Sequence, residues 1–119
     1  MKTDVQSRGF SLTPALRDAV EVQAEGYAAQ FARRLRSLQV RLFDVNGTRG
    51  GLDKGCLAYA RLGNGRTVVV ASDVDSDLYR AIASAFAKLV RGTRTAVGRR
   101  RASRRTAGVR AGTGFVVAN

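Results

Sequence analysis

Residues 78–94 read LYRAIASAFAKLVRGTR, and the spacing of the apolar residues in this stretch decides the fold class. On a helix of about 100° per residue, the apolar side collects Leu78, Ile82, Ala85, Phe86, Leu89 and Thr93. The opposite side collects Arg80, Lys88, Arg91 and Arg94. This pattern predicts an amphipathic helix, beginning near Asp75 or Ser76, that packs one face on a neighbouring layer and carries positive charge on the other.

The segments before this helix predict three further strands, a second helix and an N-terminal strand. Thr13 and Pro14 suit the cap and first position of a helix whose apolar residues recur from Leu16 to Leu35. The expected strands are Asp4 to Arg8, Leu38 to Val45, Cys56 to Leu62 and Thr67 to Ala71, with a hairpin at Gly63-Asn64-Gly65. The sequence therefore predicts an α+β, two-layer sandwich of order β-α-β-β-β-α, a four-stranded sheet with two helices on one face.

Positive charge is concentrated toward the C-terminus. The chain of 119 residues has 21 Lys and Arg against 9 Asp and Glu, and none of those acids lies beyond Asp77. A polyanion is the expected partner, because such a gradient steers a molecule toward phosphates. The candidate RNA-binding residues are Arg80, Lys88, Arg91, Arg94, Arg99, Arg100, Arg101, Arg104 and Arg105. The alternative is that the helical cations are only a solvated surface.

Length and composition indicate one domain. We expect residues 1–97 to fold, and residues 98–119 to form an arginine-rich, disordered tail, because they offer little apolar surface before Phe115. No apolar run approaches the roughly 20 residues that span a bilayer, and no hydrophobic signal segment opens the chain, so we expect a cytoplasmic protein without a membrane partner.

Most catalytic chemistry is disfavoured. Histidine is absent and Cys56 is the single cysteine, so the usual zinc sites and histidine-dependent triads cannot form. Asp73, Asp75 and Asp77 crowd together just before a helix, where capping explains carboxylates better than acid-base catalysis. We expect no enzyme activity, no metal, no cofactor and no small-molecule substrate.

Several segments resemble the ribosome hibernation-promoting factors and ribosome-associated inhibitors of bacteria. The matching parts are Leu12-Thr13-Pro14-Ala15-Leu16-Arg17 with Phe31, then Asp77-Leu78-Tyr79, Ala81-Ile82 and Lys88-Leu89. The resemblance covers residues 3 to 100 and implies a domain that binds the small ribosomal subunit and its ribosomal RNA. It further implies that the domain blocks the channel for messenger and transfer RNA, inhibits translation in starved cells, and is a monomer off the ribosome.

The resemblance also implies residue roles. Basic residues on the outer sides of both helices contact RNA phosphates in the family, and Lys88 and Arg91 fall at such positions, with Arg94 and Arg99 close to others. The first helix departs from this pattern, since Gln23 and Gly26 stand where the family usually has lysines. The loop Gly50 to Cys56 is also longer than in the best known members.

Two other functions stay open at this point. A helix and three strands that end in a basic helix also describe a general double-stranded RNA-binding module, although the strand before the first helix favours the ribosomal function. The third hypothesis is a regulatory interaction domain whose arginine tail docks on acidic partners or membranes.

Overall fold

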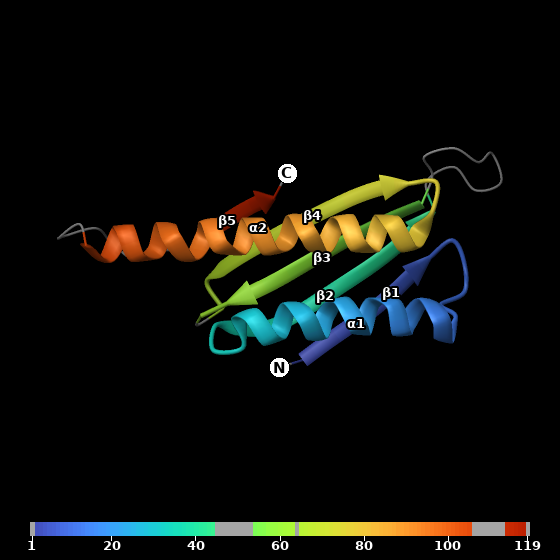
Figure 1. Ribbon diagram of the computed structural model, residues 1–119, viewed down its shortest axis with the longest axis horizontal. Coiled ribbons are helices and arrows are strands. Elements are labelled where there is room, and N and C mark those ends of the chain that lie inside the picture. Colours follow the sequence, from blue (N-terminus) through green and yellow to red (C-terminus); the bar gives the residue numbers. More distant parts are fainter. Residues whose placement is uncertain (1, 45–53, 64, 106–113, 119) are drawn as a thin grey trace.

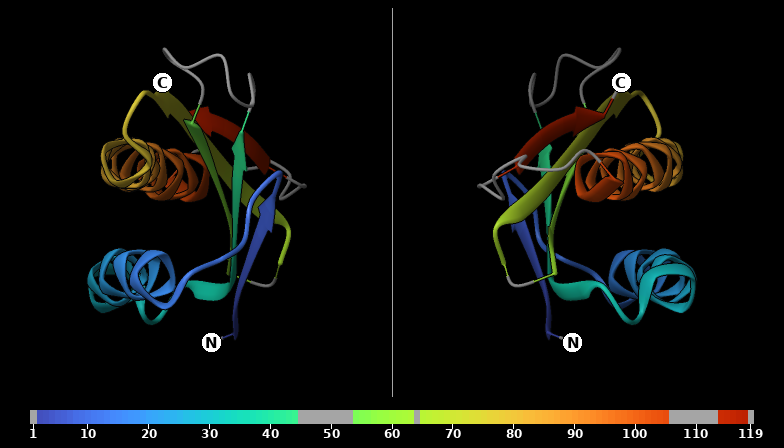
Figure 2. Two further views of the ribbon diagram at one scale, coloured as in Figure 1. Left: turned by 90° about the vertical axis from the view of Figure 1, so that its right-hand side faces the viewer. Right: turned by 90° about the vertical axis from the view of Figure 1, so that its left-hand side faces the viewer.

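The computed structural model describes residues 2–44, 54–63, 65–105 and 114–118, so the glycine-rich loop within residues 45–53 lies outside the described part. Two layers make up the molecule, a sheet and a pair of helices on one of its faces (Figures 1 and 2). The elements in chain order are β1 (Lys2–Arg8), α1 (Pro14–Phe31), β2 (Leu35–Asp44), β3 (Lys54–Leu62), β4 (Thr67–Asp75), α2 (Leu78–Arg105) and β5 (Gly114–Ala118).

The predicted order of elements and their two-layer arrangement are confirmed, but the sheet has five strands instead of four. Its strand order is β1-β2-β3-β4-β5, with β2, β3 and β4 antiparallel and each outer strand parallel to its neighbour. Two parallel strands that are neighbours in a sheet must be joined by a long crossover connection. The helices α1 and α2 supply these crossovers, from β1 to β2 and from β4 to β5.

The helix α1 begins as the sequence predicts and ends earlier. The Thr13 hydroxyl accepts a hydrogen bond from the Leu16 amide at 3.2 Å, which caps the first turn. After Phe31, the Arg34 amide donates to the Phe31 carbonyl at 2.9 Å and closes a turn. Leu35, expected on the apolar face of this helix, instead begins β2 opposite Leu62. A buried leucine fits either element, so the apolar spacing could not distinguish them.

The core lies between the helices and the middle strands. Leu38, Val40 and Leu42 of β2 face the helices and are fully buried. On the adjacent strand β3, Ala58 and Ala60 pair with Val40 and Leu38 and face the same side of the sheet. These small residues leave room for larger helical side chains such as Phe86. Burying a side chain of that size stabilises the fold by roughly 1.5–3 kcal/mol.

A buried hydrogen bond joins the two helices. The hydroxyl groups of Tyr27 in α1 and Thr93 in α2 lie 2.7 Å apart, and both residues are almost wholly buried. Each group would be costly to bury without a partner. The bond therefore fixes the position of one helix along the other.

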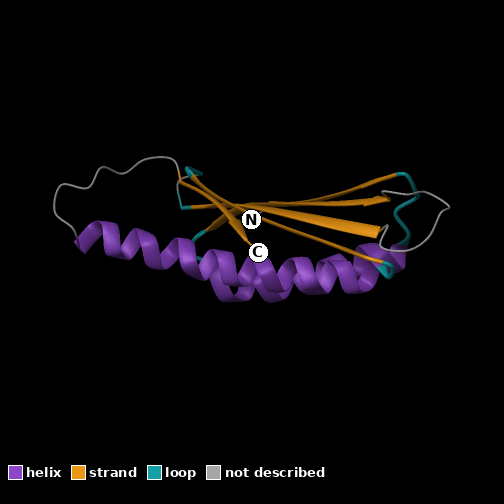
Figure 3. Cartoon of the chain, turned by 90° about the horizontal axis from the view of Figure 1, so that it is seen from above, coloured by secondary structure: helices purple, strands orange, loops and turns teal. Residues whose placement is uncertain are grey.

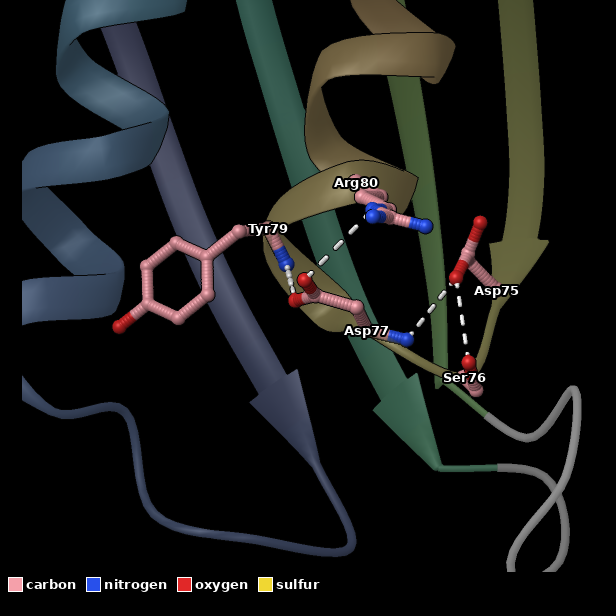
Figure 4. A network of polar contacts seen from close by, with 5 residues as sticks. All are labelled: Asp75, Ser76, Asp77, Tyr79 and Arg80. Carbon is pink, nitrogen blue, oxygen red and sulfur yellow. Dashed lines mark hydrogen bonds and ion pairs between the residues drawn. The ribbon is translucent and has the colours of Figure 1, made fainter.

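Two of the three aspartates before α2, Asp75 and Asp77, organise its first turn (Figure 4). Asp77 caps the helix, since its carboxylate accepts from the Tyr79 amide at 2.9 Å, and Asp75 accepts from the Asp77 amide at 3.0 Å. Asp73 lies on β4, where one carboxylate oxygen accepts from the Val74 amide at 2.8 Å. Capping is therefore correct for Asp77, and α2 begins at Leu78, slightly later than predicted.

The far end of α2 extends into the segment from residue 98 that the sequence predicts to be a disordered tail. The helix continues to Arg105, and β5 then returns to the sheet beside β4. Ala96 is buried, so the helix still packs against the domain beyond the last apolar residue of the predicted pattern. Arginine is a good helix former, and its run extends a helix that is already anchored. The end of α2 projects past the sheet (Figures 1 and 3).

Two buried groups that lose a proton at high pH, the Cys56 thiol and the Tyr27 hydroxyl, predict how stability depends on pH. Burial raises the pKa of the Cys56 thiol to about 12, and it raises the pKa of Tyr27 to about 12 against the opposing effect of the Thr93 hydrogen bond. In the unfolded chain the pKa is 9.0 for the thiol and 10.0 for the tyrosine hydroxyl. Between these values and the higher pKa values of the folded protein, the unfolded chain loses protons that the folded chain keeps. The free energy of unfolding should therefore be unaffected by these groups below pH 9 and fall above it, by up to about 1.4 kcal/mol per pH unit for each group.

Urea unfolding of the wild type and of Cys56→Ala, followed by circular dichroism from neutral pH to pH 11, tests this. The variant should lose stability less steeply above pH 9, because the thiol no longer contributes. Parallel curves for the two proteins would show that the thiol ionises equally in the folded and unfolded states.

Candidate nucleic-acid interface

The four cations predicted on the outer face of α2 turn toward different neighbours. Lys88 is partly buried, and its Nζ lies 3.3 Å from the Ser72 carbonyl and 3.5 Å from a carboxylate oxygen of Asp73, both on β4. Arg94 is exposed and donates to the Gln30 side chain of α1 at 3.0 Å. Lys88 therefore holds α2 to the sheet, whereas Arg94 links α2 to α1.

The other two predicted cations of this face are exposed. Arg80 lies in the first turn of α2, where its Nε is 3.9 Å from the Asp77 carboxylate (Figure 4). Arg91 is exposed one turn beyond Lys88. The structure thus spreads the four predicted residues along the helix, and Arg80 lies at the end where the aspartates gather.

Five further predicted residues belong to the last turns of α2. Their side chains lie outside the described residues, but their backbone is helical, so they continue the α2 axis beyond the sheet. These residues are Arg99, Arg100, Arg101, Arg104 and Arg105. Whether the nine predicted cations bind RNA stays a prediction.

The fold brings together five arginines that the sequence reasoning missed, and we call this group the basic end. It comprises Arg33 and Arg34 after α1, Arg36 at the start of β2, Arg61 near the end of β3 and Arg66 in the hairpin before β4. Arg33, Arg34 and Arg36 lie close together in the sequence, but Arg61 and Arg66 are far from them along the chain, so the sequence does not show that the five form one group.

Hydrogen bonds between the two turns hold the basic end together. The Gly63 amide donates to the Arg34 carbonyl at 2.6 Å, and the Arg36 guanidinium donates to the Gly63 carbonyl. Gly63 and Gly65 have φ values of 64° and 88°, which glycine adopts without strain. The hairpin thereby turns tightly enough to lie against the turn after α1, close to where α2 leaves the sheet (Figure 1).

Acidic residues lie mainly toward the opposite end. Asp73, Asp75 and Asp77 occupy the end of β4 and the turn into α2, and Asp44 pairs with Lys54 at 2.7 Å. No Asp or Glu occurs in the segments 26–43 and 54–72, which contain the basic end, or in the segment 78–105, which forms α2. The charge is therefore separated along the long axis, and the basic end is the part of the surface suited to a polyanion.

The described part of the chain offers little for catalysis. Cys56 is fully buried with a raised thiol pKa, which leaves it unreactive. The carboxylates of Asp75 and Asp77 accept hydrogen bonds from backbone amides. Within residues 2–44, 54–63, 65–105 and 114–118, no group of His, Cys, Asp or Glu is arranged to hold a metal ion. None of the described helices has the length and apolar character needed to cross a membrane.

Solved structures of two bacterial proteins have a similar fold. A ribosomal subunit interface protein from Coxiella burnetii aligns with a TM-score of 0.64 at 18% identity, over 86% of this chain and 99% of that one. The N-terminal domain of Protein Y from Thermus thermophilus aligns with a TM-score of 0.58 at 25% identity, over 82% of this chain and 96% of that one. No curated protein matches the chain in sequence.

The family comparison covers most of the domain. The sequence model described as sigma 54 modulation protein / S30EA ribosomal protein matches residues 3–101, from β1 through most of α2. This match includes both helices, four strands and every segment of the basic end. The chain therefore belongs to the sigma 54 modulation protein / S30EA ribosomal protein family.

Proposed function

We propose that this protein binds the small ribosomal subunit through phosphates of its ribosomal RNA, blocks the channel for messenger and transfer RNA, and inhibits translation under stress. Membership in a family of ribosome-associated proteins supports the partner. The proposal places the protein in the cytoplasm, where it acts by occupying the subunit without catalysis.

The observation that carries this proposal is the convergence of cations from three separate chain segments at one end of the molecule. The turn after α1, the β3–β4 hairpin and the later turns of α2 all reach this end. Because no Asp or Glu occurs in these segments, their positive charges act together on an approaching polyanion. Arginine suits phosphate contacts, since its guanidinium can donate two parallel hydrogen bonds.

The opposite end has charge of the other sign and would face away from RNA. Asp75 and Asp77 are used in the α2 cap, so they also serve the fold. A molecule with one basic end and one acidic end approaches a phosphate surface in a preferred orientation. The five terminal arginines of α2 then extend the contact beyond the domain, and they add affinity without sequence specificity.

Lys88 is a predicted RNA-binding residue that also holds α2 to β4 through its contact with Asp73. Lys88→Glu should lower the free energy of unfolding by about 0.5–1 kcal/mol, because it places a second carboxylate beside Asp73. The charge-swapped pair Lys88→Glu with Asp73→Lys should recover most of that loss, since the ion pair is restored in reverse. Thermal and urea unfolding of the three proteins measures this; no recovery in the swapped pair would show that the ion pair contributes nothing.

Salt dependence tests the phosphate contacts. Changing the five terminal arginines of α2 to Gln keeps good helix formers, and it should lower the slope of log affinity against log salt by roughly 3.5–4.5. The double variant Arg33→Gln with Arg66→Gln should lower it by roughly 1.4–1.8 on the same scale of 0.7–0.9 per contact. The measurement is binding to purified small subunits across a salt series.

Arg17→Gln provides the matched control for this series, because Arg17 is an exposed arginine in the first turn of α1, away from the basic end. Its slope should equal that of the wild type. A change in slope of the same size per arginine removed in all three variants, the Arg17 control included, would mean that only net charge matters. Full competition by excess duplex RNA would indicate a general double-stranded RNA binder.

Inhibition by occupancy predicts a fixed stoichiometry. In a translation assay with purified components, inhibition should reach completion near one protein per small subunit and should be relieved by excess initiation components. The ribosomal RNA should remain intact on a sequencing gel. Inactivation of many ribosomes by each protein molecule, or cleaved RNA, would contradict this mechanism.

A further inference from the structure

The sheet has a second face that the helices do not cover, and we call it the open face. Both helices lie on one side of the sheet, and no described helix or strand lies on the other (Figures 2 and 3). Alternation along the strands directs Leu38, Val40 and Leu42 toward the helices, so their neighbours Gln39, Arg41 and Phe43 face outward. The register then assigns Leu57, Tyr59 and Arg61 of β3 to the open face as well.

Two adjoining hollows mark the centre of this face. The first is lined by residues that include Arg8, Arg41, Phe43 and Leu57, and the second by Gln39, Arg41, Leu57 and Tyr59. Because Arg41 and Leu57 line both hollows, the two adjoin each other across β1, β2 and β3, and we call them together the trough. This trough combines exposed guanidinium groups with apolar and aromatic surface.

Both aromatic rings of the trough are held by the sheet. Gly55 has no side chain, and a Cβ atom there would approach two atoms of the Phe43 ring to 2.2 Å. The ring therefore lies across the neighbouring strand over Gly55. The Arg61 guanidinium lies over the Tyr59 ring at 5.5 Å from its centre, in a cation–π contact. Each ring is half-buried and keeps part of its surface toward solvent.

The charge of the open face selects the class of partner. Three exposed arginines, Arg8, Arg41 and Arg61, belong to it, against one described acid, Asp4, which accepts a hydrogen bond from Gln6 at 3.1 Å. A protein partner or a second copy of this basic chain would need to supply matching acids. Single-stranded RNA supplies phosphates for the arginines and unpaired bases that stack on aromatic rings.

We infer that the open face binds single-stranded RNA, with bases stacked on Tyr59 and Phe43 and phosphates paired with Arg41 and Arg61. Duplex RNA is excluded from this mode, because its bases are already stacked and a flat sheet cannot reach them. This site lies on the opposite side of the sheet from α2, and Arg61 is the residue that it shares with the basic end. It goes beyond the proposed function and does not depend on it, since a chain that fails to bind ribosomes could still bind an oligonucleotide here.

The test is fluorescence anisotropy with a short fluorescein-labelled single-stranded RNA of mixed sequence, and with the same RNA annealed to its complement, using the full chain. Tyr59→Leu keeps an apolar side chain on β3 but removes the stacking ring, so it should weaken single-strand binding about fivefold or more and leave duplex binding unchanged. Arg41→Gln, on an exposed strand position, should weaken single-strand binding and lower its salt slope by roughly 0.7.

Tyr79→Leu is the matched control, because Tyr79 is a 48% exposed tyrosine in the first turn of α2, away from the open face. It should bind the single strand as the wild type does. Equal affinity of the wild type, Tyr59→Leu and Arg41→Gln would overturn the proposal, as would equal losses for both tyrosine variants. A dimer in sedimentation velocity that Tyr59→Leu dissolves would identify the face as a contact between copies and would also overturn it.

Discussion

The packing of α2 on the centre of the sheet is the constraint on which the rest of the structure depends. Ile82, Phe86 and Leu89 are buried against strands whose facing residues include Ala58 and Ala60. The small residues let the helix lie close, and the Tyr27–Thr93 bond then sets α1 beside it. With α2 fixed, the chain can return as β5 in a parallel pairing, which requires such a crossover.

The same packing separates the charges of the molecule. The start of α2 requires a cap, so Asp77 and Asp75 are placed at one end of the sheet. The helix then carries its cations toward the other end, where the turn after α1 and the β3–β4 hairpin lie against each other. Asp44, Asp73, Asp75 and Asp77 thus serve local hydrogen bonds and ion pairs, while the segments that meet at the other end contain no acid. The ammonium group of Lys88 is drawn to Asp73 and Ser72 of β4.

A layer of helices on one face leaves the sheet with two chemically different sides. The inner side is aliphatic and buried, whereas the outer side alternates arginine and glutamine with Leu57, Tyr59 and Phe43. Two distinct RNA contacts on one small domain would follow from this division. On these two proposals, the basic end would recognise phosphates whatever their sequence, and the open face would distinguish unpaired from paired bases.

The sequence by itself determined the elements whose signals are local. The Thr13 cap, the apolar spacing of both helices, the alternation in β2 and β3 and the Gly63–Gly65 hairpin all depend on neighbours a few residues apart. The tertiary structure alone decided that Leu35 belongs to β2, that α2 continues to Arg105, and that β5 joins the sheet. It alone gathered Arg33, Arg36, Arg61 and Arg66 at one end and tied Lys88 to Asp73. Those outcomes depend on strand register and on contacts between residues far apart in the chain, where a single sequence carries no periodic signal.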